Sequence, residues 1–432
     1  MSRALAGRAP SAPTLPLTYL VTAAAAFVVA ALAVPWLGTE LAGHYYHPRL
    51  LALAHTATLG WVTLTIMGAS YQLIPIVLER EVWSERLARW QLAFLVAGIV
   101  GMVGHFAIGR WSGLVWGAGL VALGIGLHLV NVALTVRGLG RWTFTARLVA
   151  LALVGLALTA LFGLALGIDK LWKFLPGALF ANLHAHIHLA LLGWVLPMVI
   201  GVAARVYPMF LLAREPDGWV GHAQFWGLAL GVPLLVAGLL IERTAPAVAG
   251  ALLVTAAVAG HLAWVGEMVW RRKRPSLDWG LRFVLTGATF LPAAAGLGLG
   301  FAADLWSGPR LGLGYAILAL GGWVSLTIVG MMLKIVPFLV WYRAYGPHVG
   351  RRPVPTLAEL GWPAGEGAAY VLLTTGLAAL AIGTISGRAS AITGAGLLVA
   401  AGALAFGLVL IRVLGHLRSL AHTAPAPQAR AS

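Results

Sequence analysis

The chain has 432 residues, of which 60% are hydrophobic and 10% are charged, and its mean hydropathy is +0.90. These values lie outside the range of soluble globular domains and indicate an all-α integral membrane protein. The sequence has no cysteine, which excludes disulfides and thiolate metal sites, so a metal or haem ligand must come mainly from the 13 histidines. We assign the net charge of +16 to orientation in the membrane and not to nucleic-acid binding.

Twelve apolar stretches of about 20 residues or more predict twelve transmembrane helices. Most of the 29 Lys and Arg lie in the two termini and the even-numbered loops, including "RRKR" at 271–274, so both termini are predicted to be cytoplasmic. We expect a multi-pass protein of a bacterial-type inner membrane, surrounded by lipid bilayer, with disordered ends at 1–16 and 417–432. The predicted helices are 17–37, 50–78, 89–109, 114–136, 145–168, 178–212, 221–241, 247–270, 280–302, 311–341, 366–386 and 389–416.

The second, sixth and tenth of these helices share a motif. They read "GWVTLTIMGASYQLIP", "GWVLPMVIGVAARVYP" and "GWVSLTIVGMMLKIVP". The copies lie 133 and 129 residues apart, which is four helices each. The sequence therefore predicts one membrane domain, 17–416, built from three four-helix repeats at about 17–136, 145–270 and 280–416. Such repeats predict a pseudo-three-fold ring with the three motif helices inside.

Each copy of the motif ends in a proline, which is expected to bend or end the helix near its cytoplasmic end. Three positions before the proline stands a polar residue: Gln72, Arg205 or Lys334. Two interpretations remain open for these residues. They either snorkel to the membrane interface, or they line a central polar path or hold an anion.

The sixth helix has a second proline, Pro197, where the other two motif helices have Leu64 and Leu326. A proline inside a helix removes one backbone hydrogen bond. We therefore expect the sixth helix to depart from the other two at this place.

Histidines are concentrated just before the motif. His55 and His188 are equivalent, since each lies five residues before its Gly-Trp. His184 lies one helical turn before His188, so both are expected to face one site, whereas His186 points nearly the opposite way. The set His55, His184 and His188 is therefore predicted to bind a cofactor.

Three interpretations of these histidines remain open. The first is a haem b held by His55 and a histidine of the sixth helix, or by one of these with His128 or His261; His186 is a further candidate. The second is a copper or zinc ion held by His55, His184 and His188. The third is a set of neutral histidines packed in the interior without a cofactor.

Twelve helices in three repeats, with a histidine early in the second helix and more in the sixth, resemble subunit I of the haem-copper oxidase superfamily. The stretch "HTATLGWVTLTIMGASYQLIP" is especially similar to its cbb3-type cytochrome c oxidase and nitric oxide reductase branches. The resemblance implies respiratory electron transfer or nitric oxide or oxygen metabolism. It also implies that His55 ligates a haem and that the segment with His184, His186 and His188 belongs near a second metal.

The chain departs from that family in its seventh and tenth helices. The family's histidines in these helices are missing, and Ile317 stands where the repeat would place one. A standard proton-pumping terminal oxidase is therefore not expected. If the protein is an enzyme, the expected reaction is reduction of NO or O2 with electrons from a donor protein or second subunit.

Two other classes of protein stay open. One is a membrane transporter for haem, a metal or an anion, although transporters favour two repeats over three. The other is a sensor or assembly protein that handles haem or copper without redox turnover.

Overall fold

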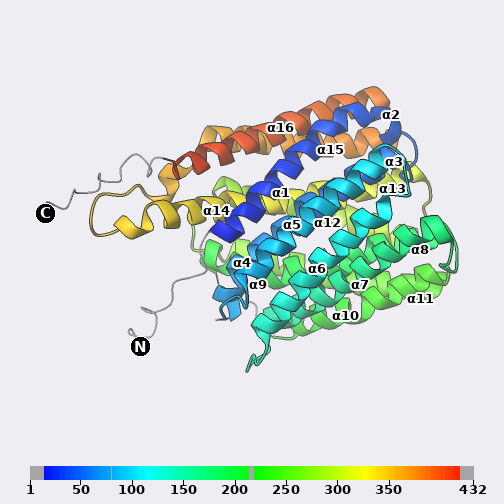
Figure 1. Ribbon diagram of the computed structural model, residues 1–432, viewed down its shortest axis with the longest axis horizontal. Helices are drawn as coiled ribbons and strands as arrows, with labels where there is room; N and C mark the ends of the chain where they lie inside the picture. Colours follow the sequence, from blue (N-terminus) through cyan, green and yellow to red (C-terminus); the bar gives the residue numbers. More distant parts are fainter. Residues whose placement is uncertain (1–13, 79, 214–217, 419–432) are drawn as a thin grey trace, which may run out of the picture.

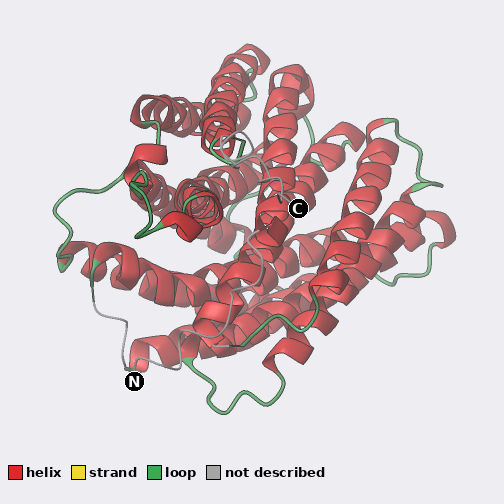
Figure 2. Cartoon of the chain, turned by 60° about the vertical axis from the view of Figure 1, so that its left-hand side comes forward, coloured by secondary structure: helices red, strands yellow, loops and turns green. Residues whose placement is uncertain are grey.

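The computed structural model describes residues 14–78, 80–213 and 218–418. These residues form a bundle of long helices and contain no strand (Figures 1 and 2). Twelve of the helices are long and apolar enough to cross a membrane, which confirms the predicted number and class. The first described helix begins and the last one ends at the same end of the bundle (Figure 1).

Eight of the twelve spans are single α-helices. They are α5 (Glu85–Ala107), α6 (Leu114–Val136), α7 (Phe144–Trp172), α10 (Trp219–Leu240), α11 (Thr244–Trp270), α12 (Trp279–Ala302), α15 (Pro363–Ser386) and α16 (Ala389–Gly415).

The other four spans consist of three helical pieces each. The first span is α1 (Thr14–Ala33), the 3₁₀ turn η1 (Val34–Leu37) and α2 (Gly38–Leu41). The three motif spans have a π-helical segment in the middle. They are α3 (Pro48–His55), η2 (Thr56–Thr63) and α4 (Leu64–Leu78); α8 (Leu179–His188), η3 (Leu189–Val195) and α9 (Leu196–Leu211); and α13 (Pro309–Ala316), η4 (Ile317–Ser325) and α14 (Leu326–Ala344). Two 3₁₀ turns, η5 (Gly346–His348) and η6 (Leu357–Leu360), lie between α14 and α15.

The predicted disordered ends need one correction. Helix α1 begins at Thr14, so Leu15 and Pro16 belong to its first turn and are buried. A proline is tolerated there because the first amides of a helix have no intrahelical partner. At the other end Leu417 and Arg418 complete a turn after α16, and residues 1–13 and 419–432 lie outside the described residues.

Helix contacts follow the predicted four-helix units. The most extensive contacts join α5 with α6, α10 with α11 and α15 with α16, the third and fourth helices of each unit. The first helix of each unit packs on its motif helix, as α1 on α4, α7 on α9 and α12 on α14. The units meet through α6 with α7 and α11 with α12, and α16 returns to α1. This pattern agrees with a closed ring of three units, which stays a prediction from the motif.

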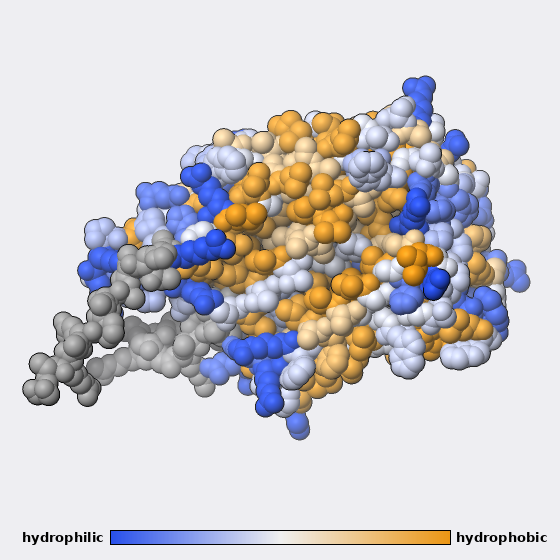
Figure 3. All heavy atoms as spheres, turned by 45° about the horizontal axis from the view of Figure 1, so that its top comes forward, coloured by the Kyte–Doolittle hydropathy of each residue, from blue (hydrophilic) through white to orange (hydrophobic). Residues whose placement is uncertain are grey.

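The surface matches a membrane-spanning bundle. Hydrophobic residues cover the middle of the face in Figure 3, and hydrophilic residues gather toward the two ends. Tryptophan is enriched at membrane interfaces, where its ring meets both lipid and headgroups. Exposed tryptophans lie at or near helix ends here: Trp36, Trp83, Trp116, Trp172, Trp219 and Trp270. Lipid contact along the twelve spans is therefore expected on both length and surface composition.

Candidate functional site

The three motif helices change from α to π hydrogen bonding at the same place. The segments η2, η3 and η4 each contain the Gly-Trp of their motif. Short π-helical segments are rare and are frequent at functional sites. Helix type does not set the sixth helix apart, because Leu64 and Leu326 follow π segments as Pro197 does. The expected departure of the sixth helix at Pro197 stays a prediction. The motif prolines also do not end the helices, since Pro75, Pro208 and Pro337 lie inside α4, α9 and α14.

His55 is the last residue of α3, directly before η2. Its Nδ1 lies 2.7 Å from the carbonyl oxygen of Leu51, one turn earlier. Its ring stacks on Phe106, with the ring centres 4.8 Å apart and the planes 25° apart. A neutral imidazole that donates from Nδ1 keeps the lone pair of Nε2 for a metal. His55 is thus held in the tautomer and the ring plane that a ligand needs.

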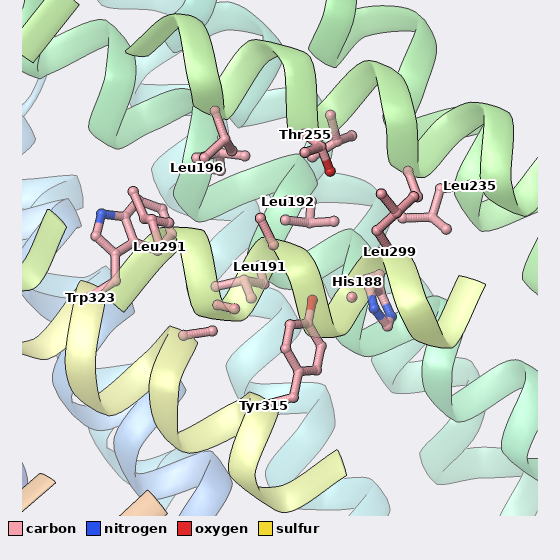
Figure 4. Close-up of a pocket in the computed structure, with 17 residues that line it drawn as sticks. His188, Leu191, Leu192, Leu196, Leu235, Thr255, Leu291, Leu299, Tyr315 and Trp323 are labelled. Atoms are coloured by element: carbon pink, nitrogen blue, oxygen red, sulfur yellow. The ribbon is translucent and has the colours of Figure 1, made fainter. Parts of the chain in front are cut away.

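His188 is held in the same way but faces a different neighbour. Its Nδ1 lies 2.8 Å from the carbonyl oxygen of His184. Its ring stacks on Tyr315 of α13, with centres 5.9 Å apart and planes 25° apart. The two rings lie at one end of a cavity that reaches Trp323 and is otherwise lined mostly by aliphatic side chains (Figure 4).

The cavity beside His188 has a volume of about 60 Å³. At 10–15 Å³ for each small probe, it would hold on the order of five water molecules. A haem macrocycle does not fit in it. His188 and Tyr315 therefore face a space for a small molecule and not for a haem.

His184 points toward the loop before α3. Its Nε2 lies 3.0 Å from the hydroxyl of Tyr45. Burial raises the pKa of Tyr45, so the phenol stays protonated, and the tautomer of His184 decides which of the two groups donates. His184 thus anchors a loop, and its Nε2 is already used.

His186 lies on the other side of the sixth span, against α7. Its ring meets the edge of Phe162 at a centre distance of 6.1 Å, and a Cβ at Gly163 would lie 2.8 Å from its Cε1. It is close enough to His55 for an electrostatic interaction. Its Nδ1 is buried and has no hydrogen-bond partner in the described residues. His186 is therefore the histidine of this span that is the best candidate to bind a ligand together with His55.

The structure does not bring His55, His184 and His188 together. Among residues 14–78, 80–213 and 218–418 there is no group of three His, Cys, Asp or Glu that could hold a metal ion. His188 stacks on Tyr315 of the next motif helix instead, and His186 is the histidine of the sixth span that interacts electrostatically with His55. In each pair one residue lies five positions before its Gly-Trp and the other lies seven positions before.

These two positions, five and seven residues before the Gly-Trp, can be read from the sequence. In the third interface the same two positions carry Ile317 and Leu53, which are both aliphatic. A comparison of equivalent positions across three helices would have paired His55 with His186. The helical spacing of one helix could not, because it does not tell which neighbour each face meets.

The donor chemistry of His55 and His186 fits a haem or a copper ion. One ring has its Nδ1 committed to a carbonyl, and the other has a buried nitrogen without a partner. Both come from inner helices of the membrane domain, where imidazole is a common haem ligand. These two residues are the ones that would hold the group.

His128 and His261 belong to different surroundings. They lie on the outer helices α6 and α11 and are buried. His128 contacts the Tyr71 hydroxyl at 3.2 Å, and His261 contacts the ring of Trp264. Their role is considered below, apart from the inner histidines.

A second cavity, of about 110 Å³, lies between the motif helices on the other side of the tryptophans. Residues at five equivalent positions from all three helices line it, together with Thr145 and Val149 of α7. These positions are the fifth, sixth, ninth, tenth and thirteenth after the first glycine of the motif. The residues of the second helix at these positions, for example, are Thr65, Ile66, Ala69, Ser70 and Leu73. Ile74 and Tyr207 line the cavity as well.

The polar residues Gln72, Arg205 and Lys334 lie at the twelfth position and do not line this cavity. Arg205 is exposed, and Gln72 is partly buried. Lys334 forms an ion pair of 2.5 Å with Asp278, the residue before α12. These three residues therefore do not line the cavity between the motif helices, and both interpretations, snorkelling and a polar path or anion site, stay predictions.

No protein-family model matches the sequence, and no curated protein matches it significantly. The fold and the site define a twelve-span membrane protein in which two of the three motif spans carry histidines just before the Gly-Trp. The resemblance to haem-copper oxidases stays a prediction that rests on the motifs.

Proposed function

We propose that the protein binds a haem b in the membrane and acts in respiratory electron transfer or in nitric oxide or oxygen metabolism. It would share the architecture of subunit I of the haem-copper oxidases. The observation that carries the proposal is the pair His55 and His186 on adjacent motif helices, one with its Nδ1 on a carbonyl and one with an unpartnered Nδ1. A bacterial-type inner membrane is proposed from the distribution of Lys and Arg.

When bound, a haem supplies one-electron chemistry and, at an open coordination position, binding of a diatomic gas. The chain's own residues would tune it. The Leu51 carbonyl orients His55 and makes its Nε2 more basic, and Phe106 fixes the ring plane. The apolar walls around the inner helices keep water out, which affects the redox potential of a haem. Because Ile317 supplies no ligand from the tenth helix, we do not propose a proton-pumping terminal oxidase.

Copper is the metal-only alternative. Zinc in a structural site takes four ligands, and the described residues offer no group of three around the histidines. Two imidazoles suit copper better, because imidazole nitrogen binds copper strongly and a low-coordinate site is acceptable to it. Transport of an anion is less favoured, since the central cavity is lined by aliphatic and hydroxyl side chains without a positive charge.

The full-length protein, purified in detergent, provides the test. We expect the dithionite-reduced minus oxidised absorption spectrum to show a b-type α-band, with about one iron per chain. His55→Ala and His186→Ala should each remove most of the band, whereas His184→Ala and His188→Ala should retain it. Gel filtration and circular dichroism of the four variants control for folding. Absence of both haem and copper at stoichiometric level, or equal loss in all four variants, would overturn the proposal.

A further inference from the structure

A single hydroxyl organises a buried polar group in the first repeat. The Tyr71 hydroxyl on α4 donates to Gln91 Oε1 on α5. Its oxygen accepts from His128 Nδ1 at 3.2 Å and from Asn131 Nδ2 at 3.3 Å, both on α6. A phenolic hydroxyl can donate one hydrogen bond and accept two, so this one is fully used. The group joins the motif helix to the outer helix pair.

The second repeat keeps half of this group. The positions 133 residues later hold Ala204, Gln224, His261 and Trp264. Gln224 and His261 are as deeply buried as their counterparts, at 3% and 2% exposure. The tyrosine has become Ala204 and the asparagine has become Trp264, whose ring centre lies 5.9 Å from that of His261.

Gln224 packs against the turn of α11 that carries His261. A Cβ placed on Gly260, the neighbour of His261, would be 3.5 Å from both Cγ and Nε2 of Gln224. Because Gln224 and His261 stand at the positions of Gln91 and His128, which both meet the Tyr71 hydroxyl, we expect their polar atoms to face a shared space.

Two atoms in this place are buried and have no hydrogen-bond partner in the described part of the chain. They are Gln224 Oε1 and His261 Nδ1. They correspond atom for atom to Gln91 Oε1 and His128 Nδ1, which the Tyr71 hydroxyl joins in the first repeat. A buried polar group that loses its hydrogen bond to water and gains none in the fold destabilises the fold. The retention of both groups therefore points to a ligand that satisfies them.

We propose that the second repeat binds one water molecule between Gln224 and His261, at the place that the Tyr71 hydroxyl takes in the first repeat. Water donates to Gln224 Oε1 and either donates to or accepts from His261 Nδ1, according to the tautomer. Buried waters make two to four such bonds and are integral to the structures that hold them. The ligand is small because the indole of Trp264 stands where the shorter Asn131 side chain stands in the first repeat. This site is independent of the haem proposal, since neither residue belongs to the inner histidine pair.

A pair of double-mutant cycles tests the bridge through the unfolding equilibrium in detergent. The first cycle combines Gln224→Leu with His261→Leu, and the matched control cycle combines Gln91→Leu with His128→Leu. Each single change should raise the equilibrium constant for unfolding roughly tenfold. In each double variant the rise in this constant should be smaller, by a factor of at least about three, than the product of the rises in the two single variants. Coupling in the control cycle with none in the Gln224 and His261 cycle would overturn the bridge.

A high-resolution cryo-electron microscopy map of the full chain supplies an independent test that needs no variant. We expect one water-sized density peak within hydrogen-bond distance of Gln224 Oε1 and His261 Nδ1, and none at the matched place beside Tyr71. A direct contact between Gln224 and His261, no peak, or a density too large for water would each overturn the assignment.

Discussion

The first and second repeats carry the same polar side chains at three equivalent positions, but the matched atoms have protein partners only in the first repeat. In the first repeat the indole nitrogen of Trp61 donates to Ser325 at 3.2 Å, and Gln91 and His128 share the Tyr71 hydroxyl. The corresponding atoms of the second repeat are buried without a partner in the described residues: Trp194 Nε1, Gln224 Oε1 and His261 Nδ1.

This difference indicates where the protein holds other molecules. Buried polar groups are nearly always hydrogen-bonded, so each exception needs a reason such as an ion, a water or a reacting group. His186, with its unpartnered Nδ1, belongs to the second repeat as well. At these matched positions the protein itself pairs the atoms of the first repeat, whereas those of the second repeat are available to another molecule.

The variant with the largest expected effect on this contrast between the two repeats is Tyr71→Phe. The change removes one hydroxyl and leaves Gln91, His128 and Asn131 without their shared partner in the interior. Since each such group costs about 1–3 kcal/mol, we expect a loss of about 3 kcal/mol in the free energy of unfolding. Denaturant unfolding in detergent, followed by circular dichroism, measures it.

Tyr207→Phe is the matched control for that variant. Tyr207 is buried on the sixth span, and no hydrogen bond of its hydroxyl is found in the described residues. We expect a change below about 1 kcal/mol. If the two variants lost stability equally, the contrast between the repeats would not hold at these positions.

The number and the places of the membrane spans could be predicted, because local apolar composition determines them. Apolar length defines a span, and the twelve predicted spans match the twelve helices to within a few residues, with α1 starting earlier because Leu15 and Pro16 pack inside. The π segments were not predicted, because the sequence around Gly60, Gly193 and Gly322 is compatible with either helix type. Which type forms depends on how the three helices pack against each other.

The sequence predicts histidines as the residues of the candidate site, and which of them share one site stays a prediction. Periodicity places His184 and His188 on one face of a helix, but it does not say which neighbour lies on that face. In the structure the neighbour of His188 is Tyr315, and the residue beside His55 is His186. Contact between helices is a property of the ring, which the sequence of one helix does not contain.

The tryptophans allow a smaller test of the same contrast. Trp61→Phe removes the indole donor to Ser325, and we expect a loss of about 1 kcal/mol beyond the effect of ring size. Trp194→Phe removes an indole nitrogen that has no partner, so the loss should be smaller or absent. Both side chains are at most 2% exposed, which makes the ring-size effect comparable. A larger loss for Trp194→Phe would show that a ligand or water satisfies its nitrogen and would extend the binding role of the second repeat.

The third repeat pairs the charge at the twelfth position of its motif, Lys334, with a carboxylate at the start of α12. Asp278 caps α12 through the backbone amide of Leu281 and pairs with Lys334 and Arg274. Burial alone would raise the pKa of Asp278. The hydrogen bonds from Lys334 and Leu281, and the positive charges of Lys334 and Arg274, instead hold this pKa below its ordinary value. A carboxyl with a depressed pKa stabilises the fold above its ordinary pKa, and this stability is lost as the pH falls through the folded value.

Lys334→Met tests this pair and has the smallest expected effect. Because Asp278 is 34% exposed, solvent screening limits the loss at neutral pH to less than about 1 kcal/mol. The variant should also lose less stability than the wild type when the pH is lowered from about 4 toward 2, since the pKa of Asp278 then lies closer to its ordinary value. Unfolding midpoints measured across this range compare the two proteins, and Asp278→Asn, which keeps a capping side chain, should remove the same acid dependence. Identical acid profiles for wild type and Lys334→Met would mean that Arg274 and the helix cap alone hold the carboxylate, and the twelfth position would then distinguish the repeats only in sequence.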